Sequence, residues 1–232
     1  MSGQENTIPV SNGGKMPSYL SIPSAGPAAG VVVVPTILGG EPYMRSFADR
    51  LAAEGFVSAL PDMFWRDEDP GVLDHDEPGF QRAHARNGRS DIELGMGDLA
   101  DVIAALKARP DCNGKIAVIG FCFGGAHVLL GAARLGIDAG ISFHGSHVGN
   151  HLDEIEGITC PLSFHYGDND AVAPMEEIER IKTAFDTLDN AEVYIYPGAI
   201  HGYMQPWRGD NGYDELASNA SWDCAMSVLK SI

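Results

Sequence analysis

The chain has 232 residues, 44% of them hydrophobic, which is enough for a large core, and we expect a single domain over residues 1–232. The net charge of −17 produces a negative surface field, which disfavours nucleic acid and anionic membranes as partners. No apolar run approaches the roughly 20 residues of a membrane-spanning helix, and residues 1–7 lack the pattern of a secretory signal, so cytoplasm is the expected location.

The cysteines are widely separated: Cys112, Cys122, Cys160 and Cys224. They form no CxxC pair and no Cys/His spacing typical of a metal site, so we expect four free thiols and neither a metal nor a cofactor.

Along the chain, a tight-turn signal, Asn12-Gly13-Gly14, separates short extended segments at 7–10 and 17–22 and predicts an N-terminal β-hairpin. Short apolar runs then alternate with segments of helical periodicity. The runs are 30–35, 56–61, 115–120, 139–143, 161–166 and 192–196. The helical segments are 43–54, 90–109, 122–135, 175–188 and 213–232.

Several of the apolar runs lack polar alternation, which is typical of strands buried on both faces of a sheet. The alternation with helices predicts an α/β fold with an open, mostly parallel sheet and helices on both faces. Functional groups are expected beyond the carboxyl ends of the strands. The polar stretches 64–89 and 145–158 are predicted to be irregular surface loops near the mouth of a pocket.

The most specific motif is Gly120-Phe121-Cys122-Phe123-Gly124, which follows an apolar run and precedes a helical segment. This G-x-nucleophile-x-G pattern is typical of the nucleophile elbow of α/β-hydrolases, where glycines allow a very tight turn. Cys122 would stand at a helix N-terminus, which favours a thiolate, and the Phe123 N–H would contribute to an oxyanion hole.

A base and an acid follow in the expected order of nucleophile, acid and histidine. Asp168 and Asp170 come after the run 161–166, and His201 comes after the run 192–196. His201 is the predicted base, and either aspartate could orient it. Of the other histidines, His127 and His165 fit core positions, whereas His144 could line the pocket.

Three segments together resemble the dienelactone hydrolase family, α/β-hydrolases with a cysteine nucleophile: GFCFGG at 120–125, GDNDAVAP at 167–174 and AIHG at 199–202. The resemblance spans roughly residues 28–230. It implies that Cys122, His201 and Asp170 form a catalytic triad, which favours Asp170 over Asp168. It also implies that the Ile37 N–H is a second oxyanion donor.

The sequence departs from the family pattern at two positions. Thr36 replaces a glutamate that contacts the thiol, and Gln205 replaces an arginine that grips the carboxylate of a dienelactone. Arg82 or Arg86 could supply the missing cation. Tyr203, Trp207 and Trp65 are expected to form a pocket wall that suits an uncharged or aromatic group, although core packing is the competing interpretation.

These features predict a hydrolase of ester or lactone bonds that acts on a small molecule as a monomer or small homo-oligomer. A thioesterase or another acyl transfer is the neighbouring alternative, because the same groups serve any activated acyl compound. The alternative from another class is a catalytically inactive binding or regulatory module with the same fold.

Overall fold

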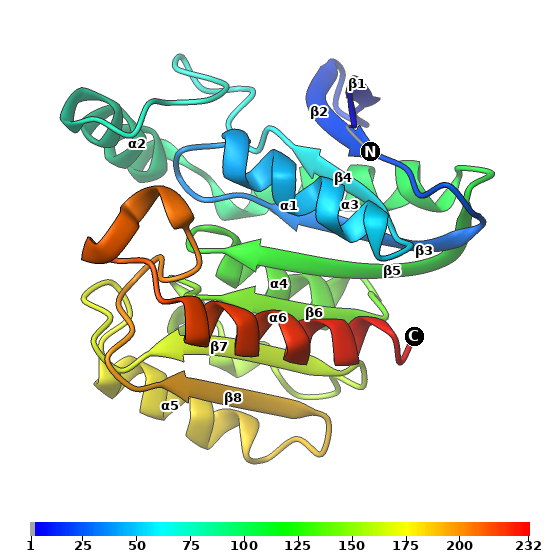
Figure 1. Ribbon diagram of the computed structural model, residues 1–232. Coiled ribbons are helices and arrows are strands. Elements are labelled where there is room, and N and C mark those ends of the chain that lie inside the picture. Colours follow the sequence, from blue (N-terminus) through cyan, green and yellow to red (C-terminus); the bar gives the residue numbers. More distant parts are fainter. Residues whose placement is uncertain (1–2) are drawn as a thin grey trace. The chain divides into compact units, whose positions relative to one another are not determined.

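The computed structural model describes residues 3–232 (Figure 1). Contacts between residues divide the chain into two compact units, one up to Ile116 and the other from Ala117 onward, which are described in turn. The expectation of a single domain therefore stays a prediction. Within residues 3–232, none of the helices combines the length and the apolar character needed to cross a membrane.

The first unit contains the predicted hairpin and the first parallel strand pair. Its strands are β1 (Gln4–Pro9), β2 (Lys15–Ser21), β3 (Ala28–Val34) and β4 (Val57–Pro61), in the spatial order β1-β2-β4-β3. β1 and β2 are antiparallel, β2 is antiparallel to β4, and β3 is parallel to β4. The hairpin is thereby confirmed.

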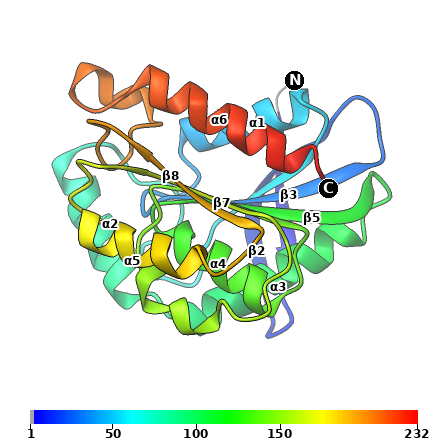
Figure 2. The same ribbon diagram turned by 90° about the horizontal axis from the view of Figure 1, so that it is seen from below.

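Helices cover both faces of the sheet of the first unit. α1 (Pro42–Ala53) packs on β2, β3 and β4, and α3 (Ile92–Lys107) packs on β1, β3 and β4 from the opposite face (Figure 2). Asp91 caps α3 by accepting hydrogen bonds from the N–H groups of Glu93 and Leu94. Such a cap satisfies N–H groups that have no partner within the helix.

The prediction of a loop over residues 64–89 is wrong for its second half, which forms α2 (Glu77–Arg89). Asp76 caps this helix by accepting a 2.8 Å hydrogen bond from the Gly79 N–H, and Pro78 occupies its first turn. The buried positions of α2 are Gly79, Ala83 and Arg86. Helical periodicity did not reveal α2 because its inner face is formed by small residues and an arginine rather than by an apolar stripe.

The second unit is a parallel sheet in the order β5-β6-β7-β8. Its strands are β5 (Cys112–Phe121), which begins before the boundary, β6 (Ala139–Phe143), β7 (Leu162–Gly167) and β8 (Ala191–Tyr196). Every residue of β6 and β7 is buried, as the unbroken apolar runs predicted. The segment predicted as an irregular loop at 145–158 contains two single-turn 3-10 helices, Val148–Asn150 and Leu152–Glu154.

Helices also cover both faces of this second sheet. α4 (Gly124–Arg134) packs on β6 and α5 (Met175–Phe185) packs on β8, both on the same face, whereas α6 (Glu215–Leu229) packs on β6 and β7 from the other (Figure 2). The predicted α/β class is confirmed, with a mostly parallel arrangement and helices on both faces. Because β5 to β8 are parallel neighbours, the residues that follow them gather at one edge of the sheet.

Candidate active site

The nucleophile candidate Cys122 lies between the end of β5 and the start of α4 in a left-handed conformation, with φ of 49°. Its N–H donates to the Phe143 carbonyl at 3.1 Å, and its own carbonyl accepts from the N–H groups of Gly125 and Ser146 at 2.9 and 2.8 Å. A non-glycine residue in this conformation is strained and persists only where the surrounding structure fixes it. The backbone hydrogen bonds to the segments on either side fix Cys122.

Gly120 shows why the turn requires a residue without a side chain. A Cβ at this position would lie 2.2 Å from the Gly124 carbonyl oxygen and 2.8 Å from Cγ2 of Val128. Both distances are far below van der Waals contact, and one of the atoms belongs to the backbone of α4. The close approach of β5 and α4, on which the elbow depends, is therefore possible only with glycine.

The base candidate His201 follows β8, and its Nδ1 lies 2.9 Å from Oδ2 and 3.1 Å from Oδ1 of Asp170, which follows β7. The Asp170 side chain is fully buried, and its Oδ1 also accepts from the N–H groups of Val172 and Ala173. Asp168 is exposed and accepts instead from the Gly198 N–H at 2.6 Å. The structure thus brings Asp170, and not Asp168, against the histidine.

The electrostatic environment of His201 favours its protonated form. Burial alone would lower the pKa of the imidazole, but its electrostatic interactions with Cys122 and Asp170 together raise it to about 9. Because Nδ1 is paired with Asp170, Nε2 is the remaining ring nitrogen, and it is buried with no hydrogen-bond partner in the described part of the chain. An imidazole oriented in this way can accept a proton at Nε2.

His144, which follows β6, lies against this group. Its imidazole centroid is 4.8 Å from that of His201, with the rings at 69°, and 5.8 Å from the ring of Tyr203. His144 is completely buried, and neither ring nitrogen has a hydrogen-bond partner among residues 3–232. Burial, followed by the charges of His201 and Arg208, holds its pKa well below the usual value, so the ring is neutral.

Sequence reasoning missed Arg208, which lies in the 3-10 helix η3 (Pro206–Asn211). Its Nε donates to Oε1 of the buried Gln205 at 3.0 Å, and its guanidinium lies against Gly202, where a Cβ would be 2.5 Å from that Nε. Burial lowers the pKa of Arg208, and the negative charges of Cys122 and Asp170 oppose this effect. An arginine retains its charge even so.

The terminal nitrogens of Arg208 remain available. Neither Nη atom donates a hydrogen bond to any residue in the described part of the chain, and the guanidinium carbon lies 4.8 Å from the Trp207 ring centroid. A half-buried guanidinium with unused donors is an anion-binding group. The only signal of this group in the sequence was an arginine seven residues after His201. The sequence does not show that η3 turns the chain back, so that Arg208 lies against Gly202 beside the histidine.

The predicted pocket aromatics have different surroundings. Tyr203 is completely buried, and its hydroxyl forms a 2.6 Å hydrogen bond with Ser221 Oγ of α6, so it packs in the core. Trp207 is half-buried beside Arg208. In the first unit, Trp65 Nε1 donates to Asp98 at 2.8 Å.

Thr36, Ile37, Arg82 and Arg86 belong to the first unit. The Thr36 hydroxyl accepts from the Leu38 N–H at 3.2 Å and is thus used within its own turn. Arg86 is completely buried and donates from Nε and Nη2 to the Ile37 carbonyl, at 2.9 and 2.6 Å. Arg82 is exposed.

The protein's own acceptors occupy both of these guanidinium groups. Nη1 of Arg86 donates to the carbonyls of Asp69 and Gly71, at 3.0 and 2.8 Å. Nε of Arg82 donates to Oδ2 of Asp69 at 2.8 Å. Arg86 thereby fixes the turn that contains Ile37, and Arg208 is the cation that lies near Cys122 within the second unit.

The two remaining histidines of the sheet and helix are packing residues, in line with their predicted core positions. Nδ1 of His127 lies 3.3 Å from the Phe123 carbonyl, and burial lowers the pKa of the ring to about 4. His165 lies between Ser163 Oγ at 2.7 Å and Tyr196 OH at 2.9 Å, and burial lowers its pKa to about 3.

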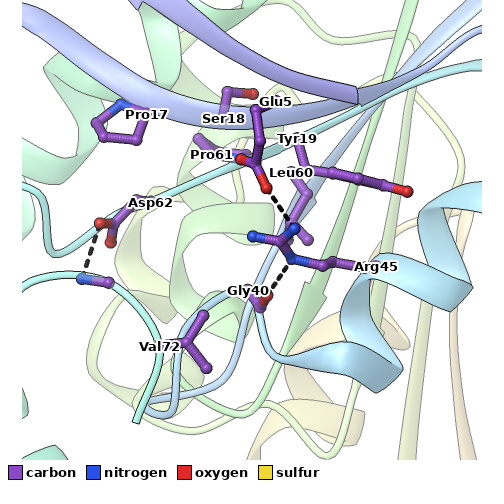
Figure 3. Close-up of a pocket in the computed structure, with 11 residues that line it drawn as sticks. Glu5, Pro17, Ser18, Tyr19, Gly40, Arg45, Leu60, Pro61, Asp62 and Val72 are labelled. Carbon is purple, nitrogen blue, oxygen red and sulfur yellow. Dashed lines mark hydrogen bonds and ion pairs between the residues drawn. The ribbon is translucent and has the colours of Figure 1, made fainter. Parts of the chain in front are cut away.

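Residues 3–232 contain no group of three or more His, Cys, Asp or Glu side chains that could hold a metal ion. A cavity of about 90 Å³ lies in the first unit, where Arg45 pairs with Glu5 and donates to the Gly40 carbonyl, and Asp62 accepts from the Gly71 N–H (Figure 3). None of the predicted site residues lines this cavity.

Comparisons with known proteins identify the family to which the chain belongs. The model of the family described as "Dienelactone hydrolase family" matches residues 16–232. Carboxymethylenebutenolidase of Pseudomonas sp. strain P51 is 32% identical over 82% of this chain and 80% of its own, and carboxymethylenebutenolidase 1 of Cupriavidus pinatubonensis is 32% identical over 80% of each.

A solved structure from Klebsiella pneumoniae, named "Putative Dienelactone Hydrolase", superimposes with a TM-score of 0.85 at 25% identity, covering 99% of this chain and 98% of that one. The fold is therefore that of the α/β-hydrolases. The match to the family model, the two relatives and the structural likeness lead to the same assignment: the chain belongs to the dienelactone hydrolase family and is a hydrolase of this kind.

Proposed function

We propose that this chain hydrolyses ester or lactone bonds with Cys122 as the nucleophile, His201 as the base and Asp170 as the residue that orients the imidazole. The observation that supports the proposal most directly is the pair of short contacts between His201 Nδ1 and the buried Asp170 carboxylate. This pairing leaves Nε2 without a hydrogen-bond partner in the described part of the chain, and Cys122, on a strained turn at the start of α4, interacts electrostatically with the same imidazole.

In the proposed reaction, Cys122 Sγ attacks the carbonyl carbon while its proton resides on His201 Nε2. The carbonyl electron pair moves to oxygen, and the backbone N–H of Phe123, at the N-terminus of α4, stabilises the oxyanion. Collapse of this intermediate breaks the C–O bond, and the leaving alkoxide takes the proton from Nε2. A thioester remains on Cys122.

Water then attacks the thioester, and His201 accepts a proton from it. Collapse of the second tetrahedral intermediate breaks the C–S bond, releasing a carboxylic acid and the original cysteine. In a lactone the alcohol and the acid are parts of one molecule, so ring opening yields a single hydroxy acid. Each of these steps requires only the protein groups and water.

Arg208 changes the expected substrate. Gln205 stands where the family pattern has an arginine, which suggested an uncharged or aromatic substrate. Arg208, however, donates a hydrogen bond to Gln205 and has unused Nη donors near Cys122. A guanidinium of this kind binds a carboxylate through two parallel hydrogen bonds. We therefore propose an ester or lactone with an acidic group, a proposal that the names of the two carboxymethylenebutenolidase relatives support.

The proposal is tested by measuring hydrolysis of p-nitrophenyl acetate by the wild type and by the Cys122→Ala and His201→Ala variants. We expect both substitutions to reduce turnover by at least about a hundredfold, and Cys160→Ala, which changes a thiol away from the elbow, to leave it unchanged. If the wild type and both variants turn over the ester at the same background rate, the chain is not a cysteine-dependent esterase.

The substrate class is tested separately with lactones, aryl esters and acyl thioesters, each with and without a carboxylate, compared by kcat/KM. We expect the acidic member of a pair to be preferred, with the preference lost in Arg208→Gln. A uniform preference for thioesters would identify the alternative, a thioesterase.

A further inference from the structure

The imidazole of His201 is held by hydrogen bonds at one edge only. Its Nδ1 lies 2.9 Å from Oδ2 of Asp170, and Nε2 has no hydrogen-bond partner among residues 3–232. One hydrogen-bonded edge restrains one ring nitrogen, so the tilt of the ring depends on what the ring packs against. This tilt sets the direction of Nε2, and a base accepts a proton efficiently only when it is correctly oriented.

A second imidazole, that of His144, packs on His201. The two ring centroids are 4.8 Å apart and the rings are at 69°, which is an edge-to-face arrangement. Tyr203 lies against His144 in the same manner, with ring centroids 5.8 Å apart and an angle of 77°. Aromatic rings prefer this geometry. His201, His144 and Tyr203 thus form a row of three rings, in which each ring limits the tilt of its neighbour.

We propose that His144 and Tyr203 are positioning residues for His201, and that Ser221 of α6 holds Tyr203 in place through a hydrogen bond. Together they keep the imidazole at the angle at which Nε2 accepts a proton. The inference rests on the proposed function in taking His201 as the base. It gives a role to α6, a helix that contributes no group to the proposed triad.

The backbone at position 144 accounts for a histidine there. Its φ of 42° is left-handed, and its N–H donates to the His165 carbonyl of β7 at 2.7 Å, which fixes this conformation. Asparagine, aspartate and histidine adopt such a conformation more readily than other residues with side chains, and of these three only histidine has a ring. A ring that can pack on His201 therefore requires histidine at this position.

Packing, rather than hydrogen bonding within the chain, orients the ring of His144. The side chain is completely buried, and neither ring nitrogen has a hydrogen-bond partner among the described residues. Its other printed ring contact is with Phe121 of β5, at 5.9 Å and 61°. Burial holds the pKa of His144 well below the usual value, so the ring is neutral and adds no like charge beside a protonated His201.

Tyr203 is fixed to α6 through both its side chain and its backbone. Its hydroxyl lies 2.6 Å from Oγ of Ser221, which donates its own hydrogen to the Ala217 carbonyl at 2.7 Å, so Tyr203 is the donor. The Tyr203 carbonyl accepts from the N–H of Asp214, the cap of α6, at 3.0 Å. Because Tyr203 is only two residues after His201, these contacts also restrain the loop that carries the imidazole.

The first test separates positioning from core packing, the competing interpretation of Tyr203. Tyr203→Phe and Ser221→Ala each remove one hydroxyl and keep the buried ring. We expect kcat/KM for p-nitrophenyl acetate to fall about ten- to a hundredfold in each. The double variant should lose no more than either single variant, since both remove the same hydrogen bond. Ser218→Ala, at another buried position of α6, is the matched control and should retain wild-type activity.

A third variant, His144→Asn, removes the ring and keeps a residue that tolerates the left-handed backbone. If His144 positions His201, kcat/KM should fall about ten- to a hundredfold here as well. Unfolding temperatures show which of the variants fold.

The second readout follows the imidazole itself rather than ester turnover. The hydrogen between His201 Nδ1 and Asp170 gives a downfield proton resonance in NMR spectra, which is assigned by its absence in His201→Ala. We expect this resonance in the wild type and in Ser218→Ala. It should be lost through exchange with water in Tyr203→Phe, Ser221→Ala and His144→Asn, because a ring that is free to tilt exposes this hydrogen.

Loss of the resonance in folded Tyr203→Phe and Ser221→Ala supports the proposal even where His144→Asn fails to fold. A resonance retained in both, or lost equally in Ser218→Ala, would overturn it, as would wild-type kcat/KM in both. Failure of the proposed function is a different result, because ester turnover could prove independent of His201 while the resonance still depended on Tyr203 and Ser221.

Discussion

The substitution Asp170→Asn tests the proposed orientation of His201, because the backbone around residue 170 determines how an amide would sit. Oδ1 of Asp170 accepts hydrogen bonds from the N–H groups of Val172 and Ala173, at 2.7 and 2.9 Å. An asparagine must keep its carbonyl oxygen there. Its NH₂ group then occupies the place of Oδ2, which lies 2.9 Å from His201 Nδ1.

An amide NH₂ only donates, so Nδ1 must become the acceptor and the imidazole proton must move to Nε2. A histidine protonated at Nε2 cannot take the proton of Cys122. The lost hydrogen bond to a charged group alone is worth about 1.5–3 kcal/mol, or one to two decades in rate. The wrong tautomer adds to this loss, and the same exchange in a serine triad costs about 10⁴.

We therefore expect kcat/KM for p-nitrophenyl acetate to fall by about 10² to 10⁴ in Asp170→Asn. Asp168→Asn is the matched control. It keeps the oxygen that accepts from the Gly198 N–H, so activity should stay within about twofold. A variant Asp170→Asn that retains more than a tenth of the activity, or a larger loss in Asp168→Asn, would refute the assignment of the acid.

Three further predictions follow from other contacts. His201 has a pKa of about 9 and is therefore protonated below that pH. Because the leaving group of an alkyl ester needs this proton, kcat/KM for an alkyl ester should fall above about pH 9. A p-nitrophenyl ester, whose leaving group needs no proton, should show no such fall. Gly120→Ala should reduce the free energy of unfolding by about 2–3 kcal/mol and lower Tm by about 5–10 °C. Gly97→Ala, at an open helical position, is the control and should raise Tm slightly. Equal changes in Tm would contradict the close approach of β5 and α4 at Gly120. Arg86→Met leaves three partly buried carbonyls without their donor and should cost about 3 kcal/mol in urea unfolding. Arg82→Met should change the free energy of unfolding little, and a similar effect of both substitutions would argue against the structural role of Arg86.

The sheet and most helices could be predicted from the sequence because burial on both faces leaves a strong pattern. Runs such as 139–143 agree with the strand ends of the structure, since every residue of β6 is buried and its one polar residue, Ser142, produces no polar alternation. α2 lacked such a signal. Its buried Arg86 has its hydrogen bonds satisfied by backbone carbonyls distant in sequence, and no periodicity in residues 77–89 could indicate those partners.

The nucleophile and the base could be predicted because each depends on local context that a sequence displays directly. Cys122 lies in a turn directly after β5, and His201 follows β8. The choice between Asp168 and Asp170 could not be made from the residues alone, because both lie in one short loop. The structure separates them through their backbone partners: Asp168 binds the N–H of Gly198, and Asp170 binds those of Val172 and Ala173. Such pairings depend on the course of the loop in space.

Gln205 and Arg208 show how a position-by-position reading of the site can mislead. Considered alone, a neutral amide at position 205 indicated that a cation had been lost and that an acidic substrate would lose binding energy. The structure instead joins the two residues through a 3.0 Å hydrogen bond, with the guanidinium seated against the bare Cα of Gly202. The neutral amide accepts a hydrogen bond from the cation, whereas a second guanidinium at 205 would face Arg208 with like charge. The positive charge of this loop is at Arg208, which interacts electrostatically with Cys122, so the charge of the site depends on Gly202, Gln205 and Arg208 together.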